Sequence, residues 1–188
     1  MATVPVAALY VDPKGPYSAL GADCWDVARD ARLYDGPFPV IAHPPCGPYC
    51  TLRRFCTRQD PALALLAVEQ VRRWGGILEH PRASLLWRTC HLPVPWDSPP
   101  LFAPREWALA VEQVRWGHPA RKATWLLIVG ISPSDLPAIP VRREPTSAVR
   151  RHRNGTGLSE IPASRCHLTP PAFAAWLLAA AAHAAPAD

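Results

Sequence analysis

Cys46 and Glu79 are the side chains whose types and positions best suit chemistry. Cys46 follows a short apolar run at 40–42 and a Pro-Pro pair, and Glu79 directly ends the apolar run at 77–78. A cysteine beside a carboxylate suits covalent catalysis, because the thiolate attacks an electrophilic carbon while the carboxyl group handles a proton. The plain alternative for Cys46 is a small apolar residue packed under a turn.

Basic side chains lie in the segment 117–122, which ends in Arg121 and Lys122. Cations next to a nucleophile and a carboxylate would support the charge that develops on a substrate. The same two residues would otherwise be the solvated tip of a hairpin, and the residues alone leave both interpretations open.

The elements that position these residues are expected to form a mostly parallel sheet. Residues 4–11 and 37–42 are predicted to be buried strands, and Pro44-Pro45 forces the chain to leave the sheet before Cys46. Open α/β sheets bind their ligands at the carboxyl ends of strands, which is where Cys46 is expected to lie.

A helix is predicted to begin at Asp60-Pro61, with Asp60 as the N-cap and Pro61 at the first helical position. Apolar residues at helical spacing continue to Trp74, and Gly75-Gly76 ends the helix. Since a strand follows at once, the order strand–helix–strand indicates a parallel α/β sheet.

Residues 107–116 and 123–130 are predicted to be two strands joined by the segment 117–122. This connection is too short for a crossover helix, so the pair is expected to be an antiparallel hairpin near the sheet edge. We therefore predict a single α/β domain over residues 1–188, with a Rossmann-like sheet that is mostly parallel and carries an antiparallel edge hairpin.

The other segments are expected to be less regular. Residues 12–17 are predicted to be a turn-rich loop, 21–36 a short helix or irregular chain, and 83–90 a short helix. Residues 131–163 are predicted to be a proline- and arginine-rich loop, and 169–185 a C-terminal helix that begins at Thr-Pro-Pro.

Composition favours a polyanionic partner. The chain has 188 residues, a net charge of +5 and a pI near 9.1, which suit nucleic acid. The N-terminal segment lacks the pattern of a secretory signal peptide, which is a positively charged start followed by a long apolar run. The apolar segment 173–185 is too short to span a membrane. We expect a cytoplasmic protein with reduced thiols and no membrane association.

A metal site is the competing use of the cysteines. His43, Cys46, Cys50 and Cys56 lie close together in the sequence, but no pair has the Cys-x2-Cys spacing that zinc sites use. The chain also lacks the His-x-Glu and Pro-Cys-x2-Cys pattern of the zinc deaminases. We therefore expect no metal.

Taken together, these motifs resemble those of the DNA cytosine-5 methyltransferases, especially small phage-encoded ones. The matching segments are Pro44-Pro45-Cys46, Glu79-His80-Pro81 and residues 116–124. They are similar to the family's Pro-Cys nucleophile motif, its Glu-Asn-Val/Pro motif and its arginine-rich motif, in the family's order. The resemblance covers residues 40–130, with a looser match at 168–178.

The resemblance implies that Cys46 attacks C6 of a cytosine flipped out of double-stranded DNA. Glu79 would hold the protonated N3 and the exocyclic amine of the base. Lys122, with Arg121 beside it, would lie near the cytosine carbonyl. The carbon C5 would then take a methyl group from S-adenosylmethionine.

The resemblance also implies a cofactor site for S-adenosylmethionine, with the candidate residues Asp12, Gly15, Pro16, Tyr17, Asp26 and Pro45. The chain departs from the family here, because the family's first loop has adjacent glycines and an extra βα unit follows it. Only 28 residues separate Tyr17 from Cys46. His80 replaces the family's Asn, and only the loop 131–163 could serve for target recognition.

Contacts to the DNA backbone are expected from basic residues, because base flipping also requires phosphate contacts. The candidates are Arg53, Arg54, Arg58, His118, Arg150, Arg151 and Arg153. The last three belong to the loop 131–163 and would otherwise be a solvated basic segment.

Three functions remain open on the sequence alone. The first is a minimal cytosine-5 DNA methyltransferase of a phage or mobile element, in the cytoplasm of a bacterial host. The second keeps the Cys46 and Glu79 chemistry on a pyrimidine but uses another one-carbon donor or none. The third is a non-catalytic DNA-binding protein derived from a methylase. An intact cofactor pocket favours the first function, and a filled or absent one favours the third.

Overall fold

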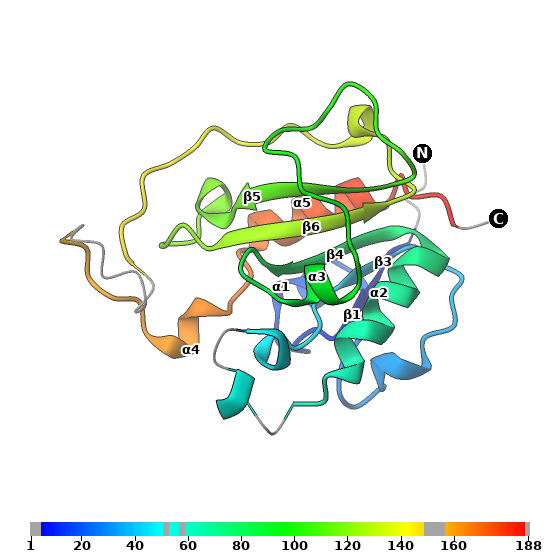
Figure 1. Ribbon diagram of the computed structural model, residues 1–188, viewed down its shortest axis with the longest axis horizontal. Helices are drawn as coiled ribbons and strands as arrows, with labels where there is room; N and C mark the ends of the chain where they lie inside the picture. Colours follow the sequence, from blue (N-terminus) through cyan, green and yellow to red (C-terminus); the bar gives the residue numbers. More distant parts are fainter. Residues whose placement is uncertain (1–4, 51–52, 57–58, 149–156, 187–188) are drawn as a thin grey trace.

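The computed structural model describes residues 5–50, 53–56, 59–148 and 157–186, and one six-stranded sheet forms its centre (Figure 1). The strands are β1 (Ala7–Leu9), β2 (Asp23–Trp25), β3 (Val40–Ala42), β4 (Gly76–Pro81), β5 (Glu106–Glu112) and β6 (Ala123–Val129), in the spatial order β2-β1-β3-β4-β6-β5. The first four strands pair in parallel, whereas β6 pairs antiparallel with both β4 and β5. Five strands therefore share one direction and β6 opposes them.

This arrangement confirms the predicted α/β class and the mostly parallel sheet with an antiparallel hairpin, and it is compatible with a Rossmann-like fold. The predicted strand over 107–116 was wrong at its end, because β5 stops at Glu112 and η4 (Gln113–Trp116) is a 3-10 turn. The turn carries Trp116 under the helix α5 (Pro171–Ala181), where its ring centroid lies 4.8 Å from that of Phe173.

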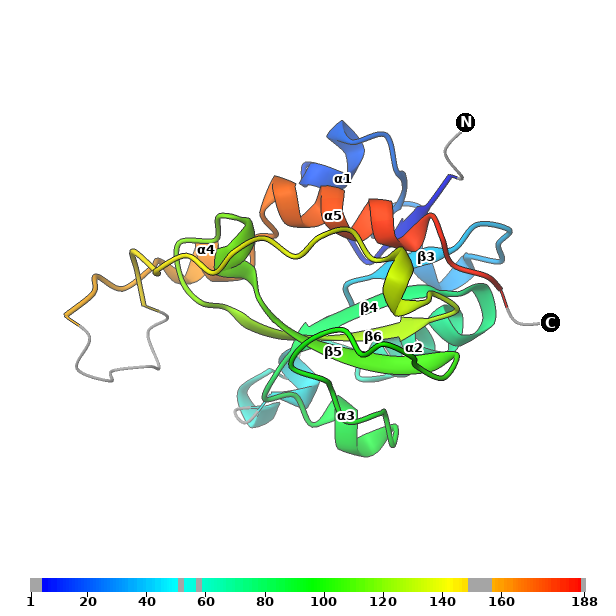
Figure 2. The same ribbon diagram turned by 90° about the horizontal axis from the view of Figure 1, so that it is seen from above.

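Helices cover both faces of the sheet, as Figure 2 shows. On one face lie α5 and the short helix α1 (Pro16–Ala19), and on the other lie α2 (Ala62–Trp74) and α3 (Leu86–Thr89). Alternate strand residues divide the core accordingly: Ile41, Ile77 and Ile128 pack on the α5 side, and Val40, Ala42 and Leu78 on the α2 side. This alternation leaves Glu79 on the α5 side of β4.

The predicted helix after Asp60 is α2, and its boundaries have local causes. The Asp60 carboxylate accepts a hydrogen bond of 2.8 Å from the backbone N–H of Ala62, which satisfies one of the unpaired donors of the first turn. Gly75 ends the helix with φ of 71°, a left-handed conformation that favours glycine. The chain then enters β4 beside β3.

Other boundaries differ from the predictions. The segment 21–36 holds β2 and the 3-10 turn η1 (Ala31–Leu33), so a strand was missed; its three residues are only half-buried at the sheet edge and lack an apolar run. Pro16 starts α1 inside the predicted loop 12–17, and the predicted helix 169–185 spans Pro171–Ala181.

Short turns make up the rest of the described chain. They are η2 (Gly47–Tyr49), η3 (Arg53–Phe55), η5 (Pro133–Asp135) and α4 (Ala163–Cys166). In the predicted loop 131–163, Ala148 and Glu160 form an isolated bridge, and the residues between 148 and 157 lie outside the described part. No helix in the described ranges has the length and apolar character needed to cross a membrane.

Candidate active site

The sheet has a switch point between β1 and β3. From β1 the chain passes to β2 on one side, and it then returns to β3 on the other. In open α/β sheets the crevice at the carboxyl ends of such strands is where ligands bind. The segment that leaves β3 there is His43 to Cys46, so the predicted position of Cys46 at a strand end is confirmed.

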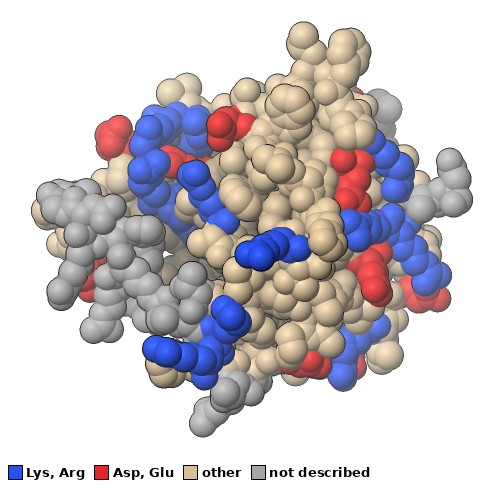
Figure 3. Space-filling view, in the orientation of Figure 1, with Lys and Arg blue, Asp and Glu red and all other residues tan. Residues whose placement is uncertain are grey.

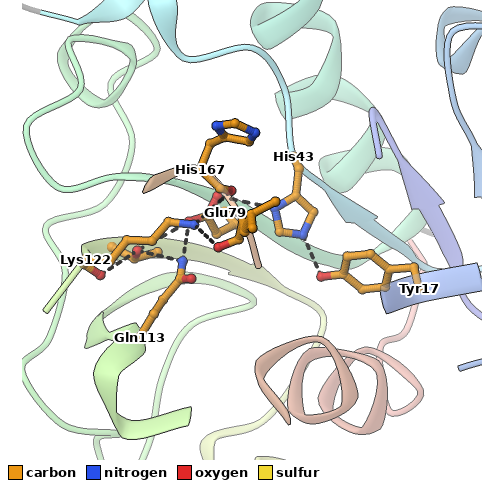
Figure 4. Close-up of polar contacts among 8 residues, drawn as sticks. Tyr17, His43, Glu79, Gln113, Lys122 and His167 are labelled. Atoms are coloured by element: carbon orange, nitrogen blue, oxygen red, sulfur yellow. Dashed lines mark hydrogen bonds and ion pairs between the residues drawn. The ribbon is translucent and has the colours of Figure 1, made fainter. Parts of the chain in front are cut away.

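His43 joins two parts of this edge. Its Nε2 lies 2.6 Å from the Tyr17 hydroxyl of α1, and its Nδ1 lies 3.3 Å from Oε2 of Glu79 on β4 (Figure 4). Tyr17 is 2% exposed, and the His43 and Glu79 side chains are 13% and 12% exposed. A buried polar chain therefore runs from α1 across the ends of β3 and β4.

The hairpin β5–β6 supplies the remaining partners of the Glu79 carboxylate. Gln113 of η4 donates a hydrogen bond of 2.8 Å from Nε2 to Oε1, and the Thr124 hydroxyl donates one of 3.3 Å to the same oxygen (Figure 4). Gln113 Nε2 also lies 3.0 Å from Thr124 Oγ1. Because these donors hold the oxygens in place, the carboxylate has one preferred orientation at the sheet edge.

The pKa of Glu79 reflects this environment. Burial alone would raise it, but the hydrogen bond and the charge of His43, together with the charge of Lys122, lower the pKa to about 2. Glu79 is thus an anion at neutral pH. In this state it accepts hydrogen bonds, and it holds no proton of its own to give to a substrate.

Lys122 lies between the hairpin and the segment before α5. Its Nζ donates hydrogen bonds of 3.1 Å to the His167 carbonyl and 2.9 Å to the Leu168 carbonyl. Its φ of 40° is a left-handed conformation that is uncommon for a lysine. Burial lowers the pKa of Lys122, while the nearby Glu79 and Cys46 act in the opposite direction.

Cys46 carries a free thiol at the start of η2. The residue is exposed at the surface. Burial raises the pKa of the thiol, Glu79 raises it further, and Lys122 lowers it. The three residues that sequence reasoning grouped together, Cys46, Glu79 and Lys122, are therefore close enough to affect one another electrostatically. At neutral pH the thiol is mostly protonated in the free protein.

The alkylation rate of Cys46 should respond in opposite directions to its two charged neighbours. Glu79→Gln removes a charge that raises the thiol pKa, so we expect iodoacetamide to react about three- to tenfold faster near pH 8. Lys122→Met removes the opposing charge and should slow the reaction. Peptide mass spectrometry separates Cys46 from the other cysteines, and changes of the same sign in both variants would contradict this electrostatic account.

Arg121 and His118 do not join the site as the structure stands. Arg121 donates Nε to Glu112 Oε1 at 2.8 Å and pairs with the same oxygen through Nη2, so its guanidinium is held at the end of β5. The His118 ring is 3% exposed, with Nδ1 at 2.8 Å from the Ala120 carbonyl. A buried ring in this position cannot reach a DNA phosphate without local rearrangement.

The other predicted DNA contacts have mixed positions. Arg53 and Arg54 belong to η3, seven and eight residues after Cys46, and both are exposed; the Arg54 guanidinium stacks over Phe55 at 4.7 Å. The predicted contacts Arg58, Arg150, Arg151 and Arg153 lie outside the described residues.

Most of the predicted cofactor residues are engaged within the protein. The Asp12 carboxylate accepts the Lys14 N–H at 2.9 Å, and the Asp12 carbonyl accepts the Gly15 N–H at 2.8 Å. A Cβ on Gly15 would approach that carbonyl to 2.9 Å, so the turn itself accounts for the glycine. Pro16 is the first residue of α1, and the Tyr17 hydroxyl is used by His43.

Asp26 and Pro45 complete the predicted cofactor set. Asp26 directly follows β2, which is where Rossmann-like sheets carry an acidic residue that binds a ribose. Here Asp26 Oδ1 accepts hydrogen bonds from the backbone N–H groups of Ala28 at 2.8 Å and Arg29 at 3.0 Å. Pro45 is half-buried beside Cys46. The described residues at the switch point therefore do not form a free cradle for S-adenosylmethionine.

Sequence reasoning did not identify the three side chains that hydrogen-bond to the Glu79 carboxylate, which are His43, Gln113 and Thr124. His43 precedes the Pro-Pro pair, and its polar ring next to a buried strand was the available signal. Both ring nitrogens of His43 are occupied by Tyr17 and Glu79. Among the described residues, no group of three or more His, Cys, Asp or Glu side chains could hold a metal ion.

His80, which replaces the family's Asn, is fully buried, and neither ring nitrogen has a hydrogen-bond partner among the described residues. Burial lowers the pKa of His80 to about 4, against 6.5 for a free imidazole. The unfolded chain therefore binds a proton at a higher pH than the folded chain does. The contribution of His80 to the free energy of unfolding is therefore fully present above about pH 6.5, where the imidazole is neutral in both states. It is lost as the pH falls toward 4, because the unfolded chain takes up the proton first.

We expect the free energy of unfolding to fall by up to ~3 kcal/mol between pH 6.5 and 4 on account of His80. His80→Leu should lose this component, while His167→Gln, at an exposed ring, should keep it. Urea titrations at several pH values measure the effect. Parallel pH profiles for wild type and His80→Leu would contradict the assignment.

Comparison of the chain with models of known protein families, with curated proteins and with solved structures finds no match.

Proposed function

We propose that the protein modifies cytosine in double-stranded DNA by covalent catalysis, as the resemblance to DNA cytosine-5 methyltransferases implies. One observation carries the proposal: Cys46, Glu79 and Lys122 come from three separate segments, after β3, on β4 and before β6, and lie at the same edge of the sheet, within range of one another's charges. A nucleophile, an oriented carboxylate and a cation are the groups that attack on a pyrimidine ring requires. The resemblance to small phage-encoded members of that family further implies a phage origin and the cytoplasm of a bacterial host.

In this mechanism the Cys46 sulfur adds to C6 of a flipped cytosine. The electron pair of the C5–C6 double bond moves onto C5, which becomes nucleophilic, while N3 takes up a proton. Once C5 has gained its substituent, loss of the C5 proton, departure of the Cys46 thiolate and release of the proton from N3 restore the neutral aromatic ring. Lys122 favours the thiolate form of Cys46 at the first step because it lowers the thiol pKa.

Glu79 would bind the base as an anion. A carboxylate has about four acceptor positions, and His43, Gln113 and Thr124 occupy three of them. The remaining position would accept an N–H group from the edge of the cytosine. Because the low pKa of Glu79 leaves it without a proton, the proton for N3 must come through another group, and His43 is in direct contact with the carboxylate.

The proposed reaction also requires a donor for the group that C5 gains. The resemblance implies S-adenosylmethionine, which would supply a methyl group. The predicted residues do not fit such a cofactor well, since Asp12, Gly15 and Tyr17 are engaged in internal hydrogen bonds. The steps above therefore involve only the base and residues of this chain, and another one-carbon donor is an alternative within the same proposal.

Transfer of label from S-adenosylmethionine to DNA tests the proposal. Wild-type protein is expected to label DNA at cytosine, and Cys46→Ser is expected to abolish the label. Mass spectrometry of nucleosides from cells that express the protein covers other donors, because any added group changes the mass of deoxycytidine. Unmodified deoxycytidine in both measurements would overturn the proposal.

One observation favours a second candidate function. The Tyr17 hydroxyl, which was expected at the cofactor site, is bonded to His43 instead, and this favours a protein that binds no cofactor there. Such a protein would bind DNA without modifying it. Sequence-selective DNA binding that is retained in Cys46→Ser, together with unmodified nucleosides, would support this candidate.

A further inference from the structure

A pocket lined by arginines lies where the hairpin β5–β6 meets the carboxyl end of β4. Its volume is about 190 Å³, and its lining includes Arg82, Arg115, Arg142, Asp97 and Glu112. Sites for drug-sized ligands usually have about 300–1,000 Å³. The size therefore suits one small group and excludes a whole nucleotide cofactor.

The pocket lining carries three arginines, Arg82, Arg115 and Arg142, against two carboxylates, Asp97 and Glu112, so its net charge favours an anion. Glu112 is neutralised by Arg121 on Oε1 and by Arg142 on Oε2, at 3.4 Å in the second case. Within the described part of the chain, no carboxylate lies within ion-pair distance of Arg82 or Arg115. Two guanidinium groups are thus left for a ligand. On the face seen in Figure 3, Lys and Arg side chains gather over the joined ends of β5 and β6.

The pocket is built into the framework of the candidate active site. Thr124 lines the pocket, and its hydroxyl also donates a hydrogen bond to Glu79. Arg82 directly follows β4, where its N–H donates to the Ala123 carbonyl at 3.2 Å. Arg115 is held by a hydrogen bond of 2.9 Å from Nη1 to the Pro140 carbonyl, which leaves its other N–H groups for a ligand.

We propose that this arginine pocket, formed by Arg82, Arg115 and Arg142, binds a backbone phosphate of the DNA next to the base held by Glu79. Guanidinium groups bind phosphate oxygens bidentately, and phosphate contacts set the register of a protein on a duplex. The inference rests on the proposed function and adds a substrate contact that neither the motifs nor the basic loops indicated.

Binding to a fluorescein-labelled duplex, measured by anisotropy between about 50 and 200 mM salt, tests the pocket. Arg82→Met is expected to weaken binding about tenfold and to reduce the slope of log affinity against log salt by about 1. Arg115→Met should act similarly. Arg73→Met is the matched control and should bind as wild type does. Arg73 is an exposed arginine in the last turn of α2, where it pairs with Asp35 and does not line the pocket. Thermal melting verifies that each variant is folded.

Binding by Arg82→Met within twofold of wild type, or with an unchanged salt slope, would overturn the proposal. Inorganic phosphate is the second probe: if its affinity falls in Arg82→Met while duplex binding stays the same, the pocket takes a free anion and the proposal is also overturned. These results are independent of methyl transfer. If Arg82→Met weakens duplex binding but no Cys46-dependent modification of DNA is found, the phosphate site is supported and the proposed reaction is overturned.

Discussion

With S-adenosylmethionine added as the methyl donor, a duplex with 5-fluorocytosine at its target position is expected to become covalently attached to Cys46. The fluorine replaces the C5 proton that must leave before the thiolate can depart, so the adduct between sulfur and C6 cannot break down after transfer. Denaturing electrophoresis detects the complex, and peptide mass spectrometry identifies the attached residue. With Cys46→Ser the trapped fraction should fall by at least about 10³-fold, since the activated nucleophile is lost.

The neighbouring Cys50→Ser is the matched control for this experiment, because it removes a half-buried thiol four residues away without touching the contacts of Glu79. It should trap DNA as wild type does. Glu79→Gln should reduce trapping strongly while leaving the Cys46 thiol more reactive toward iodoacetamide, since the amide no longer orients the base but also no longer raises the thiol pKa. A covalent complex through another cysteine would refute the assignment of the nucleophile.

Acid should destabilise the protein through Glu79 below the range in which His80 acts. The folded-state pKa of Glu79 is about 2, against 4.5 for the free side chain. Its contribution to the free energy of unfolding is complete above about pH 4.5, and about 3 kcal/mol is lost as the pH falls toward 2. Glu79→Gln should be less stable than wild type at neutral pH and should show a flatter profile between pH 4.5 and 2.

Urea denaturation at fixed ionic strength measures this profile. Glu69→Gln, at an exposed carboxylate on α2, is the control and should keep the wild-type slope. The partner His43 offers a second check, because His43→Gln removes the contact that lowers the pKa of Glu79 most and should shift the acid transition to higher pH. Identical acid profiles for wild type and Glu79→Gln would contradict the coupling of this carboxylate to folding.

Much of the fold could be predicted because its signals are local. The apolar run before Pro44-Pro45, the Asp60 carboxylate and the glycines at Gly75-Gly76 each act within a few residues. Strand β3 ends at Ala42 and α2 ends at Trp74 as predicted, whereas α2 begins at Ala62, one residue later than predicted. Strand β2 could not be predicted in this way. Its residues are half-buried at the sheet edge, and it forms because β1 offers an open parallel edge.

In the candidate site, too, the local features could be predicted from the sequence, whereas the long-range contacts could not. Sequence alone placed Cys46 beyond a strand end, because a breaker after an apolar run puts the next polar residue at the edge of a sheet. Glu79 was also expected to end its strand, but β4 continues through His80 to Pro81. Only the tertiary structure decided which partners they have. The contacts of Tyr17 with His43, of His43 with Glu79 and of Gln113 with Glu79 join residues 26, 36 and 34 positions apart.

Arg121 and Lys122 show the physical reason most clearly. They are adjacent in the sequence and equally basic, yet Arg121 pairs with Glu112 while Lys122 bonds to the His167 and Leu168 carbonyls. A charge identifies what a side chain can bind, but the partner is set by which strands and helices the sheet brings within about 3 Å of it. The residue types of Cys46 and Glu79 were therefore readable from the sequence, whereas their charge states and the arginine pocket depended on the fold.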